Sequence, residues 1–379
     1  MKNYQNDFGP FEGKIWLNTA SEGAIPRVSA KAVQEAIEWK LKPFYLTHKR
    51  FRDVPAKLKE VIGRLMNVAP EDVILGNSAT YGIHLLANGL PLKKGDEILL
   101  MQNDFPTDIL TWLGLEKKGV LIHQLRLKNY VLTPKELIEH LTSKTRVVCL
   151  SHVHTFTGHV TDIEALGKIC RSKGVVFIVN LSQSLGTRPI DLGRLSVDAI
   201  TTAGFKWLLG PYGTGFCWIK PALREKLEYN QSYWVNVLSA EALEGTDKLT
   251  LPDSRDARKY DVFGTANFFN FCPFTASIEY LLNVGIETVQ EHNDQLVKQV
   301  LDGLNDKEFR LISPQEAHSR STLVVFSHRN PEKNKAIFAS LLARGIYLAL
   351  WKGNLRIAPH IFNTPADIKA FLTTLDQLA

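Results

Sequence analysis

Short apolar runs alternate with amphipathic segments between about residues 70 and 220. The apolar runs predict buried strands at DVILG (72–76), EILLM (97–101), VLIHQL (120–125), RVVCLS (146–151), VVFIV (175–179) and DAITT (198–202). Segments with helical periodicity separate these runs, at 81–90, 106–119, 133–143 and 162–174. Strands that alternate with helices in this way predict an α/β fold with a mainly parallel sheet, covered by helices on both faces. Ligands of such sheets bind at the carboxyl ends of the strands.

The alternation of apolar runs and amphipathic segments stops at about residue 230. The stretch 230–265 is polar and contains Gly245 and Pro252, so we expect a long functional loop or an excursion that contacts a partner. Helical patterns follow at about 270–284 and 286–305, and then strands and helices alternate at 321–328, 332–345, 346–350, 355–359 and 365–378. We therefore expect a large ligand-binding domain over residues 17–270. Residues 1–16 and 271–379 are expected to form a smaller α+β domain.

The composition is that of an ordinary globular protein. The chain has 379 residues, of which 45% are hydrophobic and 22% charged. No apolar run approaches the roughly 20 residues that cross a bilayer, and the polar N-terminus lacks the apolar core of a signal peptide. We expect a cytoplasmic protein without a membrane partner.

Charge and cysteine usage exclude several classes of function. The net charge of +6 is mild, and the densest basic run, HKRFR at 48–52, reads as an exposed helix–loop junction. No nucleic-acid motif accompanies it, so no nucleic-acid partner is expected, although the basic bias suits an anionic cofactor or a carboxylate substrate. The four cysteines lie far apart and form no CxxC pair, at Cys149, Cys170, Cys217 and Cys272. We expect no metal site and no disulfide framework, but buried structural thiols.

Several separated motifs occur in one order along the chain. They are IWLNTASEGAIP (15–26), GNSATYGIHLL (76–86), NDFPTDILTW (103–112), SHVHTFTG (151–158), the long segment 179–216 that contains AGFKWLLGPYGTGF, YDVFGTANFF (260–269) and LRIAPHIFNTPADI (355–368). Together they resemble the class V aminotransferase family of fold-type I enzymes, which use pyridoxal 5′-phosphate (PLP). The family includes cysteine desulfurases, kynureninases, isopenicillin N epimerase-like proteins and aminotransferases.

The resemblance implies that Lys206 is the catalytic lysine, which binds the PLP aldehyde as a Schiff base and moves protons at the substrate α-carbon. Independently of the family, a single lysine within apolar AITTAGFKWLLG is unusual. The alternative is a surface lysine whose apolar stem packs on the protein while its amine reaches water.

Further cofactor contacts are implied by the same motifs. The strand-to-helix loop at 76–86 resembles the family's phosphate loop, and helix N-termini bind phosphate well. Phe105 inherits the aromatic place that stacks on the pyridine ring, although a core phenylalanine would fit the pattern too. His154 stands where the family has an Asn near the phenolic oxygen. The implied cofactor-binding residues are Ser78, Ala79, Thr80, Phe105, His154, Asn180, Gln183, Gly264 and Thr265.

Two further implications concern the substrate and a partner subunit. Arg356 matches the arginine that binds the α-carboxylate of an amino-acid substrate, a task that suits a bidentate guanidinium, and Asn18 is expected to line the same entrance. Gly264 and Thr265 match a segment that reaches the phosphate of the partner subunit, so the resemblance implies a homodimer.

The chain also departs from the family pattern. Asn180 replaces the Asp that faces the pyridine nitrogen, and Ala203 and Phe205 stand where Ser or Thr and His are common. An amide carries no charge to keep the ring nitrogen protonated. These changes imply fewer phosphate contacts and weaker carbanion stabilisation.

The expected function is a PLP-dependent reaction on an amino acid through Lys206, of lyase or epimerase type. An aminotransferase is the alternative on the same scaffold, because fold alone does not select the reaction. A PLP-fold binding protein with weak or no catalysis is the alternative of another class, favoured by Asn180 and disfavoured by retention of Lys206 and Arg356. A nicotinamide-dependent dehydrogenase is disfavoured, since no GxGxxG follows a predicted strand.

Overall fold

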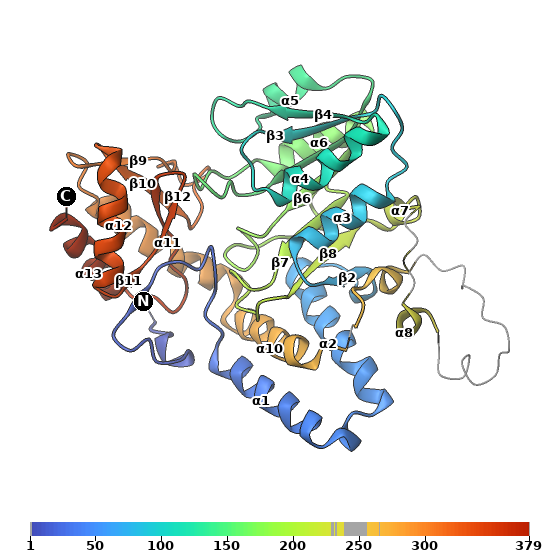
Figure 1. Cartoon of the computed structure of the whole chain (residues 1–379), viewed down its shortest axis with the longest axis horizontal. Coiled ribbons are helices and arrows are strands. Elements are labelled where there is room, and N and C mark those ends of the chain that lie inside the picture. The colour runs from blue at the N-terminus through green and yellow to red at the C-terminus, as the bar shows by residue number, and fades with distance from the viewer. Residues whose placement is uncertain (1, 229–230, 232, 239–255, 265, 379) are drawn as a thin grey trace.

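A seven-stranded sheet forms the centre of the computed structural model, which describes residues 2–228, 231, 233–238, 256–264 and 266–378 (Figure 1). The strand order is β2-β8-β7-β6-β5-β3-β4. Its strands are β2 Val73–Gly76, β3 Glu97–Met101, β4 Leu121–Leu125, β5 Thr145–Ser151, β6 Val176–Asn180, β7 Ala199–Ala203 and β8 Gly215–Ile219.

Most of this sheet is parallel, as the alternating pattern predicts. Strands β4, β3, β5, β6 and β7 pair in parallel, whereas β8 is antiparallel to both β7 and β2. All six predicted strands are confirmed. The remaining strand, β8, follows β7 through the loop of residues 204–214 instead of a helix, so strand–helix alternation does not reveal it.

Helices cover the sheet and extend beyond it. The helices of this part are α1 Arg27–Leu41, α2 His48–Met66, α3 Ala79–Gly89, α4 Thr107–Leu113, α5 Pro134–His140, α6 Ile163–Lys173, α7 Pro221–Arg224, α8 Trp234–Val237 and α10 Phe268–Val284. Helix α10 packs against α1 and α2, which project away from the sheet as a helical arm (Figure 1). Buried apolar side chains line both faces of the sheet in two clusters, which gives this part its core.

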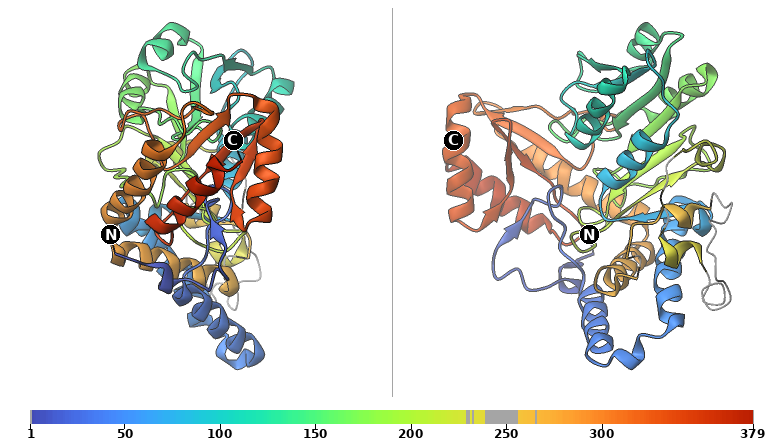
Figure 2. Two further views of the ribbon diagram at one scale, coloured as in Figure 1. Left: turned by 90° about the vertical axis from the view of Figure 1, so that its left-hand side faces the viewer. Right: turned by 45° about the vertical axis from the view of Figure 1, so that its right-hand side comes forward.

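A second, antiparallel sheet stands beside the first (Figure 2). It has the order β12-β13-β10-β9, and β1 pairs in parallel with β11 in a separate two-stranded sheet. The elements of this part are β1 Ile15–Trp16, β9 Phe309–Leu311, β10 Val324–His328, β11 Ile346–Tyr347, β12 Ala349–Trp351, β13 Asn354–Ile357, α11 Ile286–Gly303, α12 Asn334–Ala343 and α13 Pro365–Asp376. The domain boundaries at residues 16 and 270 stay predictions.

Much of the predicted loop at 230–265 lies outside the described residues, and within it the structure describes α8 and the short 3₁₀ helix Ala257–Tyr260. Across the described ranges, no helix is long and apolar enough to cross a membrane. The same ranges contain no group of three or more His, Cys, Asp or Glu side chains placed to hold a metal ion.

Candidate active site

Lys206 follows strand β7 and lies in the interior. Its side chain is buried, and its Nζ lies 5.1 Å from the centroid of the Phe105 ring. The backbone around it is held from two sides, because Gly204 N donates to Thr214 O and Gly23 N donates to Phe205 O. Burial lowers the pKa of the Lys206 amine to about 8, with a further contribution from the Arg356 cation. A buried amine with this pKa is a much better nucleophile at neutral pH than a surface lysine.

The predicted phosphate loop lies at the same edge of the sheet. Strand β8 pairs with β2 and β7, so Gly215 is the register partner of both Gly76 and Ala203. Ser78 follows β2 directly and caps α3, accepting from Tyr81 N at 3.3 Å. A side chain on Gly215 would press against the Ser78 backbone, which explains the glycine there.

The N-terminus of α3 therefore lies at the end of the sheet where β7 leads to Lys206. Ala79 and Thr80 begin this helix, whose first N–H groups have no acceptor within the helix. Thr80 Oγ1 also lies 2.9 Å from Thr107 Oγ1 on α4. These orphan donors and hydroxyls suit a phosphate.

His154 lies against Asn103, in the NDFPTD motif that contains Phe105, with both of its ring nitrogens engaged. Its Nδ1 lies 2.8 Å from Thr157 Oγ1, and its Nε2 lies 3.1 Å from the Asn103 carbonyl, to which it must donate. Burial lowers the pKa of His154, so its imidazole is neutral at pH 7. The ring can therefore pack beside a cofactor, but its nitrogens are committed to protein partners.

Asn180 ends strand β6 and faces a carboxyl group. Its Nδ2 lies 2.9 and 3.0 Å from the two carboxyl oxygens of Asp108, and its Oδ1 accepts from Ser182 N at 3.0 Å. Ser151 Oγ, at the end of the neighbouring strand β5, donates to Asp108 Oδ2 at 2.9 Å. Burial, together with the charge of Asp104, raises the pKa of Asp108 to about 8.

Gln183 connects three segments of the site instead of standing free. Its Nε2 donates to Ala20 O at 3.1 Å, and its Oε1 accepts from Trp207 Nε1 at 2.8 Å. It therefore holds the N-terminal NTASEG segment against the residue that follows Lys206. One amide hydrogen is left for a ligand.

Arg356 on β13 is a buried cation that forms no ion pair with any residue the structure describes. Only 1% of its surface is exposed, and it donates to Thr155 O at 3.2 Å and to Ser21 Oγ at 2.9 Å. Its Nε has no hydrogen-bond partner among the described residues, and burial lowers its pKa to about 10. A buried charge of this kind requires an anion. The buried Oδ1 of Asn18 likewise has no partner in the described part of the chain.

The predicted dimer segment is described only in part. Thr265 lies outside the described residues, and Gly264 has a φ of +73° with open space around it. The segment before them is anchored to β2, because Asp261 Oδ1 accepts from Leu75 N and Val262 N donates to Leu75 O. Lys59 of α2 holds the same Asp261 carboxylate at 2.9 Å.

The sequence reasoning missed three acidic residues of this site. Asp108 contacts Asn180, and Asp104 accepts from Ser151 N and from Phe105 N. Glu22 is half-buried, and burial raises its pKa against the opposing effect of Lys206. These acidic residues lie within the NDFPTD and NTASEG motifs, and their place in those motifs could have identified them as residues of the site.

The residues present fit PLP. Its aldehyde requires a buried amine, its ring a flat apolar partner and its phosphate a set of N–H groups, which Lys206, Phe105 and the start of α3 offer. The unpaired guanidinium of Arg356 fits the carboxylate of an amino acid bound to the cofactor. The groups that fit the cofactor belong to the seven-stranded sheet, and Arg356 belongs to the antiparallel sheet.

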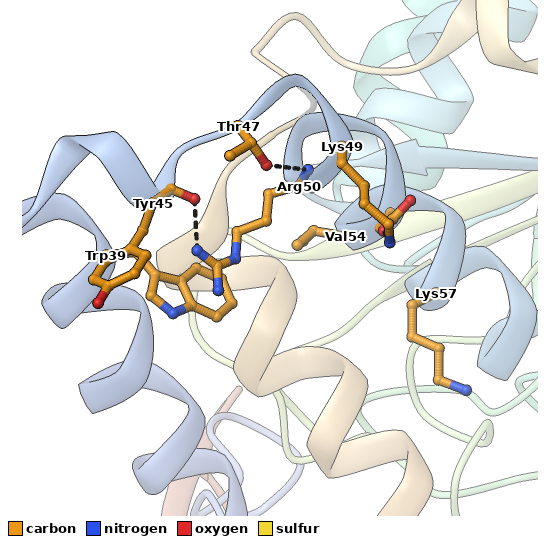
Figure 3. A pocket seen from close by; sticks show the side chains of 8 residues that line it. Trp39, Tyr45, Thr47, Lys49, Arg50, Val54 and Lys57 are labelled. Atoms are coloured by element: carbon orange, nitrogen blue, oxygen red, sulfur yellow. Dashed lines mark hydrogen bonds and ion pairs between the residues drawn. The ribbon is translucent and has the colours of Figure 1, made fainter.

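One cavity lies away from this cluster, and a second lies at its edge. One of about 530 Å³ occupies the elbow between α1 and α2, where the Arg50 guanidinium lies 4.1 Å from the centroid of the Trp39 ring (Figure 3). The basic run HKRFR forms the first turn of α2 there, capped by Thr47. The other, of about 400 Å³, borders His154 and includes Arg310 and Lys352. Only the second touches a predicted site residue.

Comparison with known proteins gives consistent matches over nearly the whole chain. The sequence profile described as "Aminotransferase class-V" matches residues 16–355. A probable cysteine desulfurase of Methanothermobacter thermautotrophicus is 24% identical over 85% of this chain and 82% of its own length. The isopenicillin N epimerase of Streptomyces clavuligerus is 26% identical over 96% of this chain and 94% of its own.

Solved structures share the fold. A mutant of C-DES with glycine covalently linked to its PLP cofactor superposes with a TM-score of 0.90 at 22% identity, covering 99% of both chains. The complex of the cystine C-S lyase C-DES with cysteine persulfide gives a TM-score of 0.87 at 23% identity, covering 97% of this chain and 99% of that one.

Proposed function

The chain belongs to the class V aminotransferase family and is a PLP-dependent enzyme, and we propose that it acts on an amino acid through Lys206 in a lyase- or epimerase-type reaction. The observation that carries this proposal is the pairing of a buried amine with a buried, uncompensated guanidinium. Arg356 lies close enough to Lys206 for its positive charge to lower the pKa of the Lys206 amine. Two buried cations are costly without anionic ligands, and bound PLP together with an amino-acid carboxylate would supply them.

Each residue then has a definite task. PLP, when bound, withdraws electrons from the substrate α-carbon. Lys206 would hold the cofactor through its aldehyde, and its amine would take up or return the proton at the substrate α-carbon. Arg356 holds the α-carboxylate, with Asn18 at the same entrance. Phe105 packs against the cofactor ring, and Ser78, Ala79 and Thr80 hold its phosphate.

The rate of cofactor capture should depend on pH through Lys206. Only a neutral amine attacks an aldehyde, and burial places the pKa of this amine at about 8, against about 10.4 for an ordinary lysine. We therefore expect the rate of PLP uptake by the cofactor-free protein to rise about tenfold per pH unit below 8 and to level off above it. Stopped-flow absorbance measures this rate. A rate that keeps rising to pH 10 would show an ordinary, exposed amine.

The reaction type is proposed from the sequence relatives. Isopenicillin N epimerase, which matches nearly the full length, is named for a change of configuration, and the desulfurase relatives are named for removing sulfur from cysteine. The PLP-loaded protein should be offered a panel of L- and D-amino acids. Exchange of the α-proton, inversion, or release of a β-substituent supports the proposal. Stoichiometric conversion to the keto acid and aminated cofactor would instead identify an aminotransferase, and no spectral response would indicate a binding protein.

Cysteine desulfuration in its usual form should be absent. That reaction requires a reactive thiolate at the site, and neither 313–321 nor 348–357 contains a cysteine. Burial raises the pKa of every cysteine, to about 12 for Cys170 and about 11 for Cys272, and well above the usual range for Cys149 and Cys217. Mass spectrometry after incubation with free cysteine should find no protein persulfide. A persulfide on any of these thiols that depends on turnover would contradict this expectation.

We also propose a cytoplasmic homodimer with composite active sites. The family segment that carries Gly264 and Thr265 supports it, as do exposed apolar side chains on the helical arm, with Phe44 75% and Leu41 68% exposed. Mixing inactive Lys206→Ala and Thr265→Ala subunits should restore part of the activity through hybrid dimers. Full activity of a monomer at low protein concentration would contradict a shared site.

A further inference from the structure

Asp108 is a buried carboxyl group to which the proposed function gives no task. It lies in the first turn of α4 and is 0% exposed. All its contacts described above come from the carboxyl ends of neighbouring strands, Asn180 on β6 and Ser151 on β5. These strand ends are where a sheet of this type binds its ligand.

The backbone of Ser182 fixes the orientation of the Asn180 amide. A backbone N–H only donates, so the Asn180 oxygen must face Ser182 N and the Asn180 nitrogen must face Asp108. The Asn180 oxygen then faces the other way and accepts from Ser182 N at 3.0 Å. A carbonyl oxygen has two lone pairs. The Asn180 oxygen therefore keeps one lone pair with which it can accept a hydrogen bond from a ligand.

An acceptor at this position selects one protonation state of the cofactor. It stabilises a ring nitrogen that carries a proton and repels one that presents its lone pair. An anion behind the amide polarises it further, and in a buried site this effect is stronger than in water. Asp108 is the acidic side chain that contacts Asn180, so the carboxyl group missing from position 180 is present one hydrogen bond away.

We propose that Asp108 is a positioning residue that supplies, through Asn180, the negative charge that keeps the ring nitrogen of PLP protonated. The proposal rests on the proposed function, since it requires PLP in this site. It changes the expectation of a weak electron sink that Asn180 alone suggests. In place of a carboxyl group on strand β6, this chain has one in the first turn of helix α4.

The charges around Asp108 are consistent with this role. Asp104, in the loop before α4, disfavours a second negative charge, whereas the Lys206 cation favours it. The neighbouring Cys149 thiol has a strongly raised pKa and stays neutral. Without the cofactor, Asp108 is protonated up to a pH of about 8. A cationic ring nitrogen nearby would lower this pKa and release the proton.

The test compares the wild type with Asp108→Asn and with the exchange variant Asp108→Asn/Asn180→Asp. The exchange variant keeps one carboxyl and one amide but reverses their places. Each purified protein is loaded with PLP labelled with ¹⁵N at the ring nitrogen, whose chemical shift reports protonation directly. Far-UV circular dichroism checks the fold, and kcat/KM is measured with any amino acid found to react.

We expect a protonated ring nitrogen at pH 7.5 in the wild type, an unprotonated one in Asp108→Asn, and protonation regained in the exchange variant. The loss of one charge-assisted interaction should lower kcat/KM of Asp108→Asn by about 10- to 100-fold. An unprotonated nitrogen in the wild type, or an unchanged shift in Asp108→Asn, would overturn the proposal. If Asp108→Asn does not fold, the wild-type shift and the exchange variant still decide it. Failure of the wild type to take up PLP would refute the proposed function instead, before any ring nitrogen is observed.

Discussion

Replacement of Lys206 by alanine is expected to lower turnover by at least about 10²- to 10⁴-fold, the contribution of a positioned proton-transfer group. The variant loses both the covalent link to the cofactor and the group that moves the α-proton. Its fold should survive, because the change removes a buried amine whose charged form is disfavoured by burial and by Arg356 in the cofactor-free protein. The melting temperature of the cofactor-free variant should therefore equal or exceed that of the wild type.

Lys206→Arg is the matched control for this experiment. It keeps a cation of similar length but cannot form an imine with an aldehyde, so it should be as inactive as the alanine variant. Turnover rates and melting curves measured together separate chemistry from folding. Near-normal turnover in either variant would mean that another amine performs the chemistry.

The second large effect is expected at Arg356. Truncation of one member of a buried, hydrogen-bonded charge pair costs about 2–5 kcal/mol, which corresponds to roughly 30- to 4,000-fold. Arg356→Ala should therefore lower kcat/KM for an α-amino acid by that factor, largely through a higher KM. PLP uptake should change little, because Arg356 is proposed to bind the substrate.

Arg356→Lys retains the charge but loses the bidentate geometry. Its kcat/KM should fall between those of the wild type and the alanine variant. Amines that lack the carboxylate provide a further comparison, since the truncation should not weaken their binding. An equal loss for amines and amino acids would show that Arg356 supports the fold instead of the substrate.

The sequence predicts the large sheet well because its signal is local. Strand β3 is predicted with its observed bounds, Glu97–Met101, and the other predicted strands differ at their ends by one or two residues. Buried parallel strands are continuous apolar runs, so periodicity suffices to find them. Strand β8 lies outside the strand–helix alternation because it returns antiparallel through the GPYG turn, which only tertiary pairing reveals.

The site is predicted less completely for a related reason. Lys206, Phe105 and Arg356 stand within recognisable motifs, and the structure brings Lys206 to within 5.1 Å of the Phe105 ring. The partners of these residues come from distant segments. Asn180 meets Asp108, 72 positions earlier in the chain, and Arg356 meets Ser21, 335 positions earlier. A single sequence gives no indication of such pairs.

His154 and Gln183 illustrate the same limit. Their motif positions imply contacts with a cofactor, yet their polar atoms bind Asn103, Thr157, Ala20 and Trp207. A motif predicts that a side chain lies near the cofactor. It does not predict which of its hydrogen-bonding atoms are already used by the protein.

The central claim is that Lys206 carries PLP, and borohydride reduction followed by peptide mapping tests it most directly. Reduction of the PLP-loaded protein should fix the pyridoxyl group on the Lys206 peptide, with one group per chain and none in Lys206→Ala. An adduct on another lysine, or a chain that takes up no PLP at all, would contradict the account.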